Sequence, residues 1–260
     1  MEELLELKQS VTKMISAPNE IRDEFLQKLN AILLTKYMIS VNNVIIEPLR
    51  IEAYLYIDGV FEDKFIHRSS KNALYGDYQR NRFGQLYIHP GYGGIDIVLS
   101  NDNTYAYSCL IKNSRIIVDG KITEPFVKQY RVAEFLKEIG VPMCCQQVVL
   151  KKRDHTKNDI VFNTVRKGLL SIKERPDFSK EEQAQFNTRP IASLIELKEH
   201  KSSQFDFETG FGGDRAVVDY LKKVKRDNPD ITTNELNRLR KELYPNGSKQ
   251  LFEKTFGKIK

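Results

Sequence analysis

The sequence of 260 residues contains little cysteine and no long hydrophobic run. Its three cysteines include the adjacent pair Cys144 and Cys145, which cannot easily bridge to itself, and no Cys or His spacing is typical of a zinc site. No stretch approaches the roughly 18 apolar residues of a membrane-spanning helix, and the N-terminus lacks a basic segment followed by an apolar one. We therefore expect a cytoplasmic protein without disulfides, metal or membrane contacts.

The sequence also has only a small excess of charge of one sign. The formal net charge is +6, and residues 214–260 carry twelve Lys and Arg against seven Asp and Glu, which places +5 in this segment. The other residues carry 29 basic against 28 acidic side chains. A basic segment of this kind often binds nucleic acid, and a solvated, lysine-rich helical face explains it equally well.

Enough hydrophobic residues remain for a globular core, since they make up 40% of the sequence and exclude a disordered chain. Apolar residues at helical spacing predict helices over 3–15, 21–34 and 125–140, and residues 161–174 fit one further short helix. Alternating or continuous apolar runs predict strands over 37–41, 44–57, 85–89, 94–100, 104–111, 115–120, 145–152 and 190–198.

These elements predict one mixed, mostly antiparallel α+β domain with flanking helices over residues 1–213. A glycine-rich stretch separates it from a basic helical extension over residues 214–260. Three helices are expected in this extension: one over about 215–226, one that begins at a cap formed by Thr232 or Thr233, and one after the turn at 245–247.

Glu52 is the first candidate for chemistry. In the strand that contains it, Ile51 and Ala53 lie on one face while Glu52 and Tyr54 lie on the other. A carboxylate beside a tyrosine can serve as a general base in an aromatic-walled pocket if partial burial tunes its pKa. A glutamate on the solvated face of a half-buried strand is the alternative interpretation.

The segment 80–94 combines arginines, aromatic residues and glycines. Tyr87 and His89 lie two residues apart and therefore share one face of the predicted strand. Glycines allow the backbone to approach a ligand closely, and Tyr92 on the glycine-rich turn can protrude as a wedge. The glycine spacing differs from that of phosphate-binding loops, and an ordinary hairpin with packed tyrosines is the alternative.

Three other polar residues accompany these segments. His67 follows the Glu52 strand in a polar loop and can donate or accept a hydrogen bond to a base edge or a phosphate. Arg80 and Arg82 suit phosphate contacts and could equally be solvated.

In this order, the segments resemble those of the alkyladenine (3-methyladenine) DNA glycosylases. The family's catalytic strand reads approximately V-E-T-E-A-Y-L, and residues 50–55 read R-I-E-A-Y-L. The family continues with P-R-N-R-G-M-F and L-Y-V-Y-I-I-Y-G, and this chain has R-N-R-F at 80–83 and L-Y-I-H-P-G-Y-G at 86–93. Residues 109–120, C-L-I-K-N-S-R-I-I-V-D-G, resemble the family's V-L-I-R-A-x-E-P strand, with Lys112 in place of the arginine.

The resemblance implies the 3-methyladenine DNA glycosylase fold and a role for each matching residue. Glu52 would deprotonate the water that attacks the sugar C1′ of a damaged purine nucleotide. Tyr54 and His89 would enclose the extruded base, and His67 would make a polar contact to it. Tyr92 would fill the gap left in the duplex, because the target bond is inaccessible inside the base stack.

The same resemblance implies the partner and the chemistry. Arg80, Arg82 and Lys112 would contact phosphates, and the partner would be duplex DNA that carries an alkylated or deaminated purine. The protein would act as a monomer in base excision repair, and it would need no metal or organic cofactor.

Three other interpretations remain open. A non-catalytic nucleic-acid-binding protein could retain a degenerate glycosylase fold and use the basic extension for affinity. An enzyme acting on free nucleosides or another small glycoside could use the same pocket. Finally, the strand tyrosines could simply be packed in an α+β protein of another function.

Overall fold

The computed structural model describes residues 4–66, 82–89, 94–141, 149–153, 161–166, 169, 179–187, 189–195, 217–218, 221–222, 224–226, 228–243 and 249–259. The fold is mixed α+β with an antiparallel sheet, as the sequence predicts. The chain forms two compact units, Met1–Asp159 and Ile160–Lys260. The predicted boundary between residues 213 and 214 lies outside the described residues and stays a prediction.

The first unit begins with two helices, α1 (Leu5–Ile15) and α2 (Arg22–Lys36), which a short 3₁₀ helix, η2 (Asn19–Ile21), connects. Both predicted helices are therefore confirmed. The Arg22 guanidinium is buried and donates hydrogen bonds to the carbonyl oxygens of Ile15 and Ala17. Ile15 is the last residue of α1 and its carbonyl has no intrahelical partner, and Ala17 lies just after the helix, so these bonds fix the turn between the helices.

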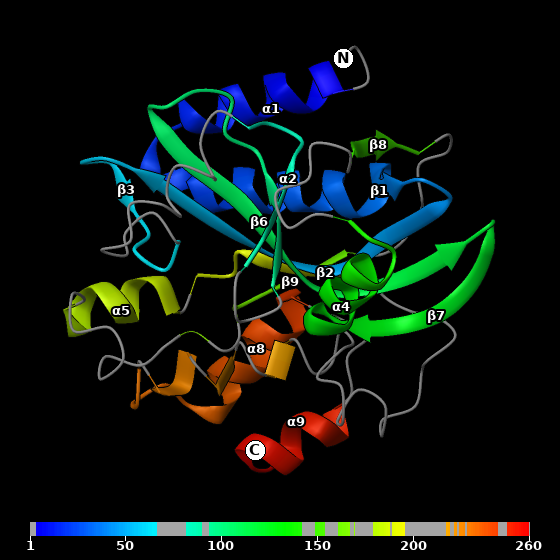
Figure 1. Ribbon diagram of the computed structural model, residues 1–260. Coiled ribbons are helices and arrows are strands. Elements are labelled where there is room, and N and C mark those ends of the chain that lie inside the picture. The colour runs from blue at the N-terminus through cyan, green and yellow to red at the C-terminus, as the bar shows by residue number, and fades with distance from the viewer. Residues whose placement is uncertain are drawn as a thin grey trace. The chain divides into compact units, whose positions relative to one another are not determined.

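The strands of the first unit are β1 (Tyr37–Val41), β2 (Val44–Ile57), β3 (Phe61–Glu62), β4 (Leu86–Ile88), β5 (Ile95–Val98), β6 (Tyr105–Val118), β7 (Lys121–Lys128) and β8 (Val149–Lys152). They follow the order β4-β5-β6-β2-β1-β8, with β3 paired to β2 and β7 paired to β6. Each pair is antiparallel. The long strands β2 and β6 form the centre of this sheet (Figure 1).

The β6–β7 hairpin corrects the sequence prediction in two places. Strand β6 is continuous, where the apolar pattern predicted two strands, and β7 includes residues 125–128, where a helix was predicted. The turn between the strands contains Asp119 (φ 49°) and Gly120 (φ 74°), a dipeptide that favours the two-residue hairpin turn. That dipeptide was the missed signal. Helix α4 (Gln129–Glu138) then begins later than predicted.

Helix α2 packs along β2 and β1. Cys109 of β6 pairs with Ala53 of β2. Its thiol lies 3.5 Å from the side-chain amide oxygen of Asn30 in α2. The helix side of the sheet therefore carries Ile51 and Ala53. Burial raises the pKa of the Cys109 thiol to about 12, so this cysteine is an inert core residue.

The second unit contains strands β9 (Val161–Thr164) and β10 (Ala192–Ile195), which pair antiparallel, and helix α5 (Lys180–Asn187). The helix predicted over 161–174 is therefore wrong at its start. Phe162 and Thr164 are buried while Val161 and Asn163 are only partly buried, which is the period of a strand.

The C-terminal helices agree with the sequence prediction. Helical residues occur at 217–218, 221–222 and 224–226, followed by α8 (Thr233–Leu243) and α9 (Lys249–Phe256). In the part of the chain that the structure describes, no helix has the length and apolar character needed to cross a membrane.

Candidate functional site

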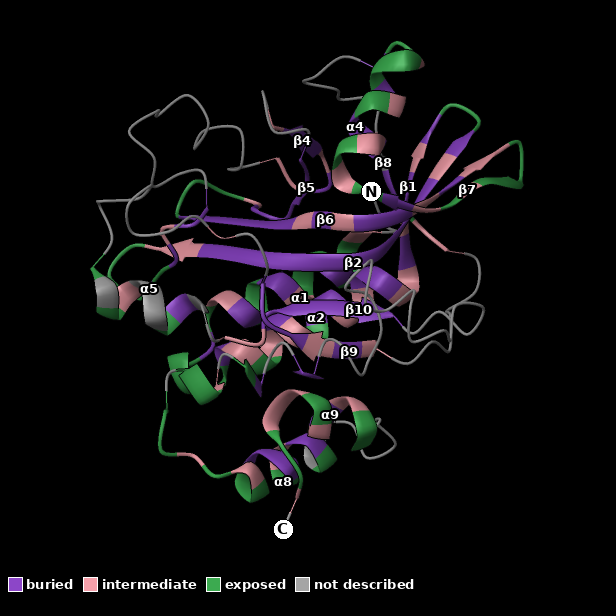
Figure 2. Ribbon diagram, turned by 90° about the horizontal axis from the view of Figure 1, so that it is seen from below, coloured by how far each residue is buried: buried purple, intermediate pink, exposed green. Residues whose placement is uncertain are grey.

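Strand β2 carries Glu52 and Tyr54 on the face opposite to α2. Nearly all of β2 is buried (Figure 2), and the Glu52 side chain is fully inaccessible to solvent. The solvated-face interpretation of this glutamate is therefore wrong. An ionised carboxylate at such a position requires hydrogen bonds and opposite charges to offset its desolvation.

Three neighbouring side chains supply these partners. The Tyr54 hydroxyl donates a hydrogen bond of 3.0 Å to Glu52 Oε2. The Arg50 guanidinium lies 3.8 Å from Oε1, and the Lys112 ammonium from β6 lies 3.9 Å from Oε2. We call these four residues the Glu52 site. It holds a carboxylate, two cations and a phenol on two adjacent strands.

Arg50 was not identified from the sequence. It lies at a register shift between β2 and β6, where Pro48 and Arg50 interrupt the regular pairing. A bulge of this kind re-aims side chains, and proline cannot donate to the ladder. The proline was visible in the sequence, but the direction of the arginine beside it depends on the pairing with β6.

A second polar pair consists of His89, which directly follows β4 and is 10% exposed, and the buried Asp96 of β5. His89 Nε2 is 3.0 Å from Asp96 Oδ1, so the two form an ion pair when the imidazole is protonated. The Ser108 hydroxyl of β6 donates to Asp96 Oδ2 at 3.2 Å. The carboxylate therefore stands between the serine and the histidine, whereas a nucleophilic triad needs the imidazole in the middle.

The position of the His89 ring is restricted on several sides. Its ring centroid lies 4.8 Å from that of Tyr87, as expected for residues that share a strand face. Its backbone N–H donates to the Gly94 carbonyl at 2.8 Å. A Cβ atom at Gly94 would lie 3.1 Å from His89 Cδ2, so the glycine leaves room for the imidazole.

The strand register relates the two buried groups. Glu52 pairs with Leu110 of β6, and Leu110 pairs with Asp96 of β5. Directly paired residues point to the same face, and neighbouring strands lie about 4.8 Å apart, so the Cα atoms of Glu52 and Asp96 are about 10 Å apart with Leu110 between them. Glu52 and Asp96 therefore share one sheet face.

Asp96 was also missed by the sequence analysis. It is a carboxylate between two buried isoleucines, Ile95 and Ile97, in a run interpreted only as a strand. A charged residue on an otherwise apolar strand is a usable signal, because buried charges occur mainly where they are paired.

The remaining predicted site residues have different positions. Arg82 is partly buried in the turn before β4, where its backbone N–H donates to the Ser100 carbonyl at 3.1 Å. Lys112, predicted to contact phosphate, is 21% exposed and faces Glu52. His67, Arg80 and Tyr92 lie outside the described residues, and their roles stay predictions.

Among the described residues, no cluster of three or more His, Cys, Asp and Glu side chains could hold a metal ion. No family model, curated protein or solved structure matches this chain. The resemblance to the alkyladenine DNA glycosylases therefore depends on the motifs of the sequence alone.

Proposed function

We propose that the protein is a monofunctional DNA glycosylase that hydrolyses the N-glycosidic bond of alkylated or deaminated purines in duplex DNA. The observation that carries this proposal is the buried Glu52 carboxylate, hydrogen-bonded by Tyr54 of the same strand. A buried acid with specific charge partners is typical of functional sites, although structural ion pairs share this feature. The 3-methyladenine DNA glycosylase fold is part of the same proposal.

The proposed reaction uses Glu52 as a general base. The purine nucleotide is first extruded from the duplex, because its glycosidic bond is inaccessible in the stack. A water oxygen then bonds to the sugar C1′, and Glu52 takes one proton from that water. The bond between C1′ and the purine nitrogen breaks, and its electron pair leaves with the base. A cationic alkylated purine departs as a neutral base, whereas a neutral purine also takes up one proton from solvent water.

The other residues would position the base and the carboxylate. Tyr54 holds Glu52 Oε2 through its hydroxyl and would place its ring against the extruded purine. His89 would form the opposite wall where the glycosylase family has a tyrosine. The Asp96 carboxylate, 3.0 Å from His89 Nε2, and the adjacent Gly94 support the orientation of that imidazole. His67 and Tyr92 retain the roles that the resemblance implies.

One observation favours a second candidate function. Glu52 is fully buried and already has three polar partners, so a water molecule must displace part of this arrangement to be activated. A chain that has lost the chemistry could retain these contacts as a structural ion cluster. The second candidate is therefore a non-catalytic nucleic-acid-binding protein with a degenerate glycosylase fold.

A base-release assay separates the two functions. The substrates are duplex oligonucleotides that contain one hypoxanthine, ethenoadenine or methylated adenine, and the proteins are wild type, Glu52→Gln and Glu134→Gln. Glu134 lies on the exposed face of α4 and is the matched control. If the protein is a glycosylase, wild type and the control release the base. The rate of release falls at least about 100-fold in Glu52→Gln, which is the usual contribution of a general base.

Folding is checked in the same experiment, because Glu52→Gln changes a buried group. Thermal unfolding and binding to the damaged duplex should remain measurable for each protein. If no protein releases a base from any substrate but all bind DNA, the glycosylase proposal fails and the binding function takes its place. If release persists in a folded Glu52→Gln protein, Glu52 is not the base.

A further inference from the structure

The C-terminal helical module, residues 217–259, has a hydrophobic core of its own. Val217, Leu221, Leu236 and Phe252 are buried together. The partly buried residues packed against them are Val224, Ile231, Leu239, Phe256 and Ile259. All of these residues come from the module itself, so its helices bury their apolar faces against one another.

Polar contacts fix the helices of the module. Thr232 and Glu235 form a capping box at the start of α8: the Glu235 N–H donates to Thr232 Oγ1 at 3.2 Å, and the Thr232 N–H donates to Glu235 Oε2 at 2.8 Å. The backbone hydrogen bond from Thr232, followed by the bond from its hydroxyl, lowers the pKa of Glu235. Thr233 Oγ1 donates to the Phe256 carbonyl at 3.2 Å and joins α8 to α9.

Helix α8 has a buried face and an exposed face, as the burial colours of Figure 2 show. Leu236 and Arg240 are buried on the inner face, four residues apart. Asn234, Arg238 and Lys241 are exposed on the outer face. These three positions are spaced by four and three residues and form one stripe about 10 Å long at 1.5 Å per residue.

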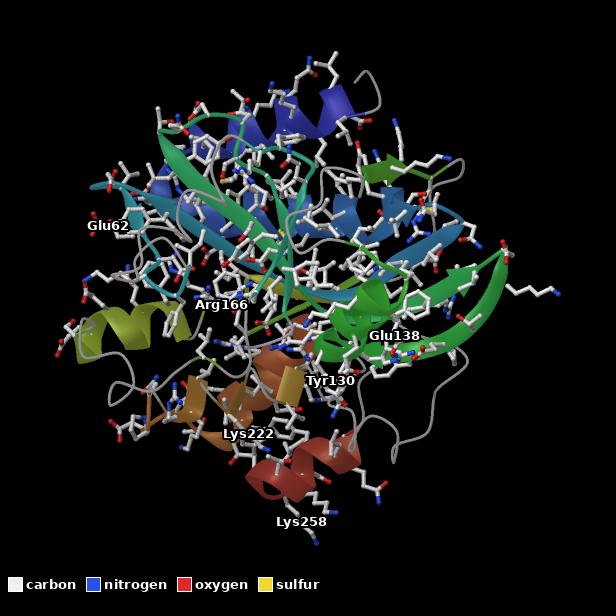
Figure 3. The ribbon with its side chains drawn as sticks, in the orientation of Figure 1. Glu62, Tyr130, Glu138, Arg166, Lys222 and Lys258 are labelled. Atoms are coloured by element: carbon white, nitrogen blue, oxygen red, sulfur yellow. The ribbon has the colours of Figure 1, made fainter. Side chains whose placement is uncertain are left out.

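Further cations are exposed on the other helices of the module. Lys222 lies in the helical segment before α8, Lys254 lies in α9, and Lys258 follows α9. Figure 3 shows Lys258 extending outward beyond the end of α9. Within the described residues, these cations thus lie on the surface of a folded module.

We propose that this module binds duplex DNA, with the outer face of α8 directed at a groove and the surrounding lysines contacting phosphates. An α-helix fits the B-DNA major groove, which is about 12 Å wide, and arginine and asparagine form paired hydrogen bonds with guanine and adenine edges. Lysine and arginine contacts to phosphates supply affinity that does not depend on base sequence. This activity requires neither Glu52 nor base release.

The arrangement of apolar residues favours DNA over a membrane surface. A helix that binds a lipid surface presents a broad apolar face outward, next to its cations. In α8 the leucine residues Leu236 and Leu239 belong to the internal hydrophobic cluster of the module, while the outer stripe is polar and basic. The outer stripe of α8 therefore has the charge that a phosphate backbone requires, and it lacks the apolar surface that acyl chains require.

The test measures binding of the full-length protein to an undamaged 20-base-pair duplex, so its result is independent of glycosylase activity. The variant combines Lys222→Gln, Arg238→Gln and Lys241→Gln, and fluorescence anisotropy gives the dissociation constant across a salt series. The matched control removes three exposed lysines of the first unit, with the substitutions Lys8→Gln, Lys13→Gln and Lys137→Gln. Both variants lose the same charge.

The module variant should bind the duplex at least about tenfold more weakly, and the slope of log K against log salt should fall by about 0.9 for each phosphate contact removed. The control should bind like wild type.

Equal binding by wild type and the module variant overturns the proposal, as does an equal loss in the control. Binding to phosphatidylserine vesicles without binding to the duplex would also overturn it and assign the face to a membrane. Thermal unfolding verifies that both variants fold.

Discussion

The sheet of the first unit and the C-terminal helical module use charged residues in opposite ways. Around Glu52 and Asp96 the charges are buried and oriented by specific hydrogen bonds. On the module the cations are mostly exposed at the surface of a hydrophobic cluster. Buried charges are tolerated only with defined partners, whereas exposed cations keep their hydration and cost little. The fold therefore fixes the charges of the sheet, and it leaves those of the module accessible to solvent.

Removal of the Glu52 carboxylate should give the largest effect on stability. In Glu52→Ala, Arg50 and Lys112 lose an opposite charge 3.8 Å and 3.9 Å away. Truncating one partner of a buried ion pair typically costs about 3–5 kcal/mol, and we expect a loss of this size. Urea unfolding measures it, with Glu134→Ala on the exposed face of α4 as the control. Equal unfolding free energies for the two variants would mean that the ion pairs of the Glu52 site contribute nothing to stability.

The Tyr54 hydroxyl should have the next largest effect. Tyr54→Phe removes the donor to Glu52 Oε2 while the ring stays in place, and a hydrogen bond to a charged group contributes about 1.5–3 kcal/mol. The control is Tyr130→Phe, since Tyr130 is 52% exposed. Chemical denaturation of both variants gives the comparison. A Tyr54→Phe protein as stable as the Tyr130→Phe protein would contradict the proposed support of Glu52 by this hydroxyl.

Two arginines of α8 test the contrast within the module. Arg240 is buried, with its guanidinium carbon 5.8 Å from the Phe252 ring centroid and its Nε bonded to Asn237 at 3.0 Å. Arg240→Ala should therefore destabilise the module by about 1–2 kcal/mol through lost packing and cation–π contact. Arg238→Ala on the outer face should change stability by less than about 0.5 kcal/mol. Amide hydrogen exchange in α8 and α9 locates the effect.

The second measurement on these variants is DNA binding, for which Arg238→Ala should show the effect. Arg238→Ala should weaken binding to an undamaged duplex, because Arg238 belongs to the proposed contact surface. If Arg240→Ala retains the exchange protection of wild type, the inward role of Arg240 is wrong. If Arg238→Ala alone lowers protection, Arg238 is a structural residue of α8.

The sequence predicts the local elements of both regions better than it predicts their contacts. Helices α1, α2 and α8 and strands β1 and β2 follow from apolar spacing and caps, which are local properties. The continuous β6 and the added β7 follow from a hairpin turn at Asp119 and Gly120, which outweighs the weak helical pattern after it. Apolar periodicity alone does not decide between a strand and a short helix, as residues 161–164 also demonstrate.

The candidate site illustrates the same limit. The face of Glu52 follows from strand alternation, and so does the ring contact between His89 and Tyr87, although β4 ends at Ile88 and His89 lies one residue beyond it. The burial of Glu52 does not follow, because alternation predicts one solvated face and β2 is buried on both. The positions of Arg50, the partner of Glu52, and of Asp96, the partner of His89, depend on the register of three strands. Arg50 lies at the irregular pairing of β2 with β6, and Asp96 pairs with Leu110 of β6. Such contacts between segments distant in sequence have no local signature.

The smallest expected effect comes from an exposed ion cluster that belongs to neither charged region. Glu6 of α1 lies 3.1 Å from Lys36 and 3.0 Å from Lys152, and its carboxylate is half exposed. The hydrogen bond from Lys152, followed by that from Lys36, lowers the pKa of Glu6 below its ordinary value of 4.5. A carboxyl whose pKa is lowered by folding stabilises the protein above the unfolded pKa, and this contribution is lost as the pH falls through the folded pKa.

Glu6→Gln should therefore lower the free energy of unfolding at pH 7 by no more than about 1 kcal/mol, because solvent and salt screen an exposed cluster. The difference from wild type should decrease as the pH falls below the ordinary pKa of 4.5 and disappear once the pH is below the lowered pKa of the folded protein. Glu20→Gln, at an exposed glutamate of η2, is the control and should change the free energy of unfolding at pH 7 by less than about 0.5 kcal/mol. A Glu6 effect that equals the Glu52 effect, or that grows with acidity, would contradict the distinction between buried and exposed charges, since only buried groups bear the full cost of desolvation.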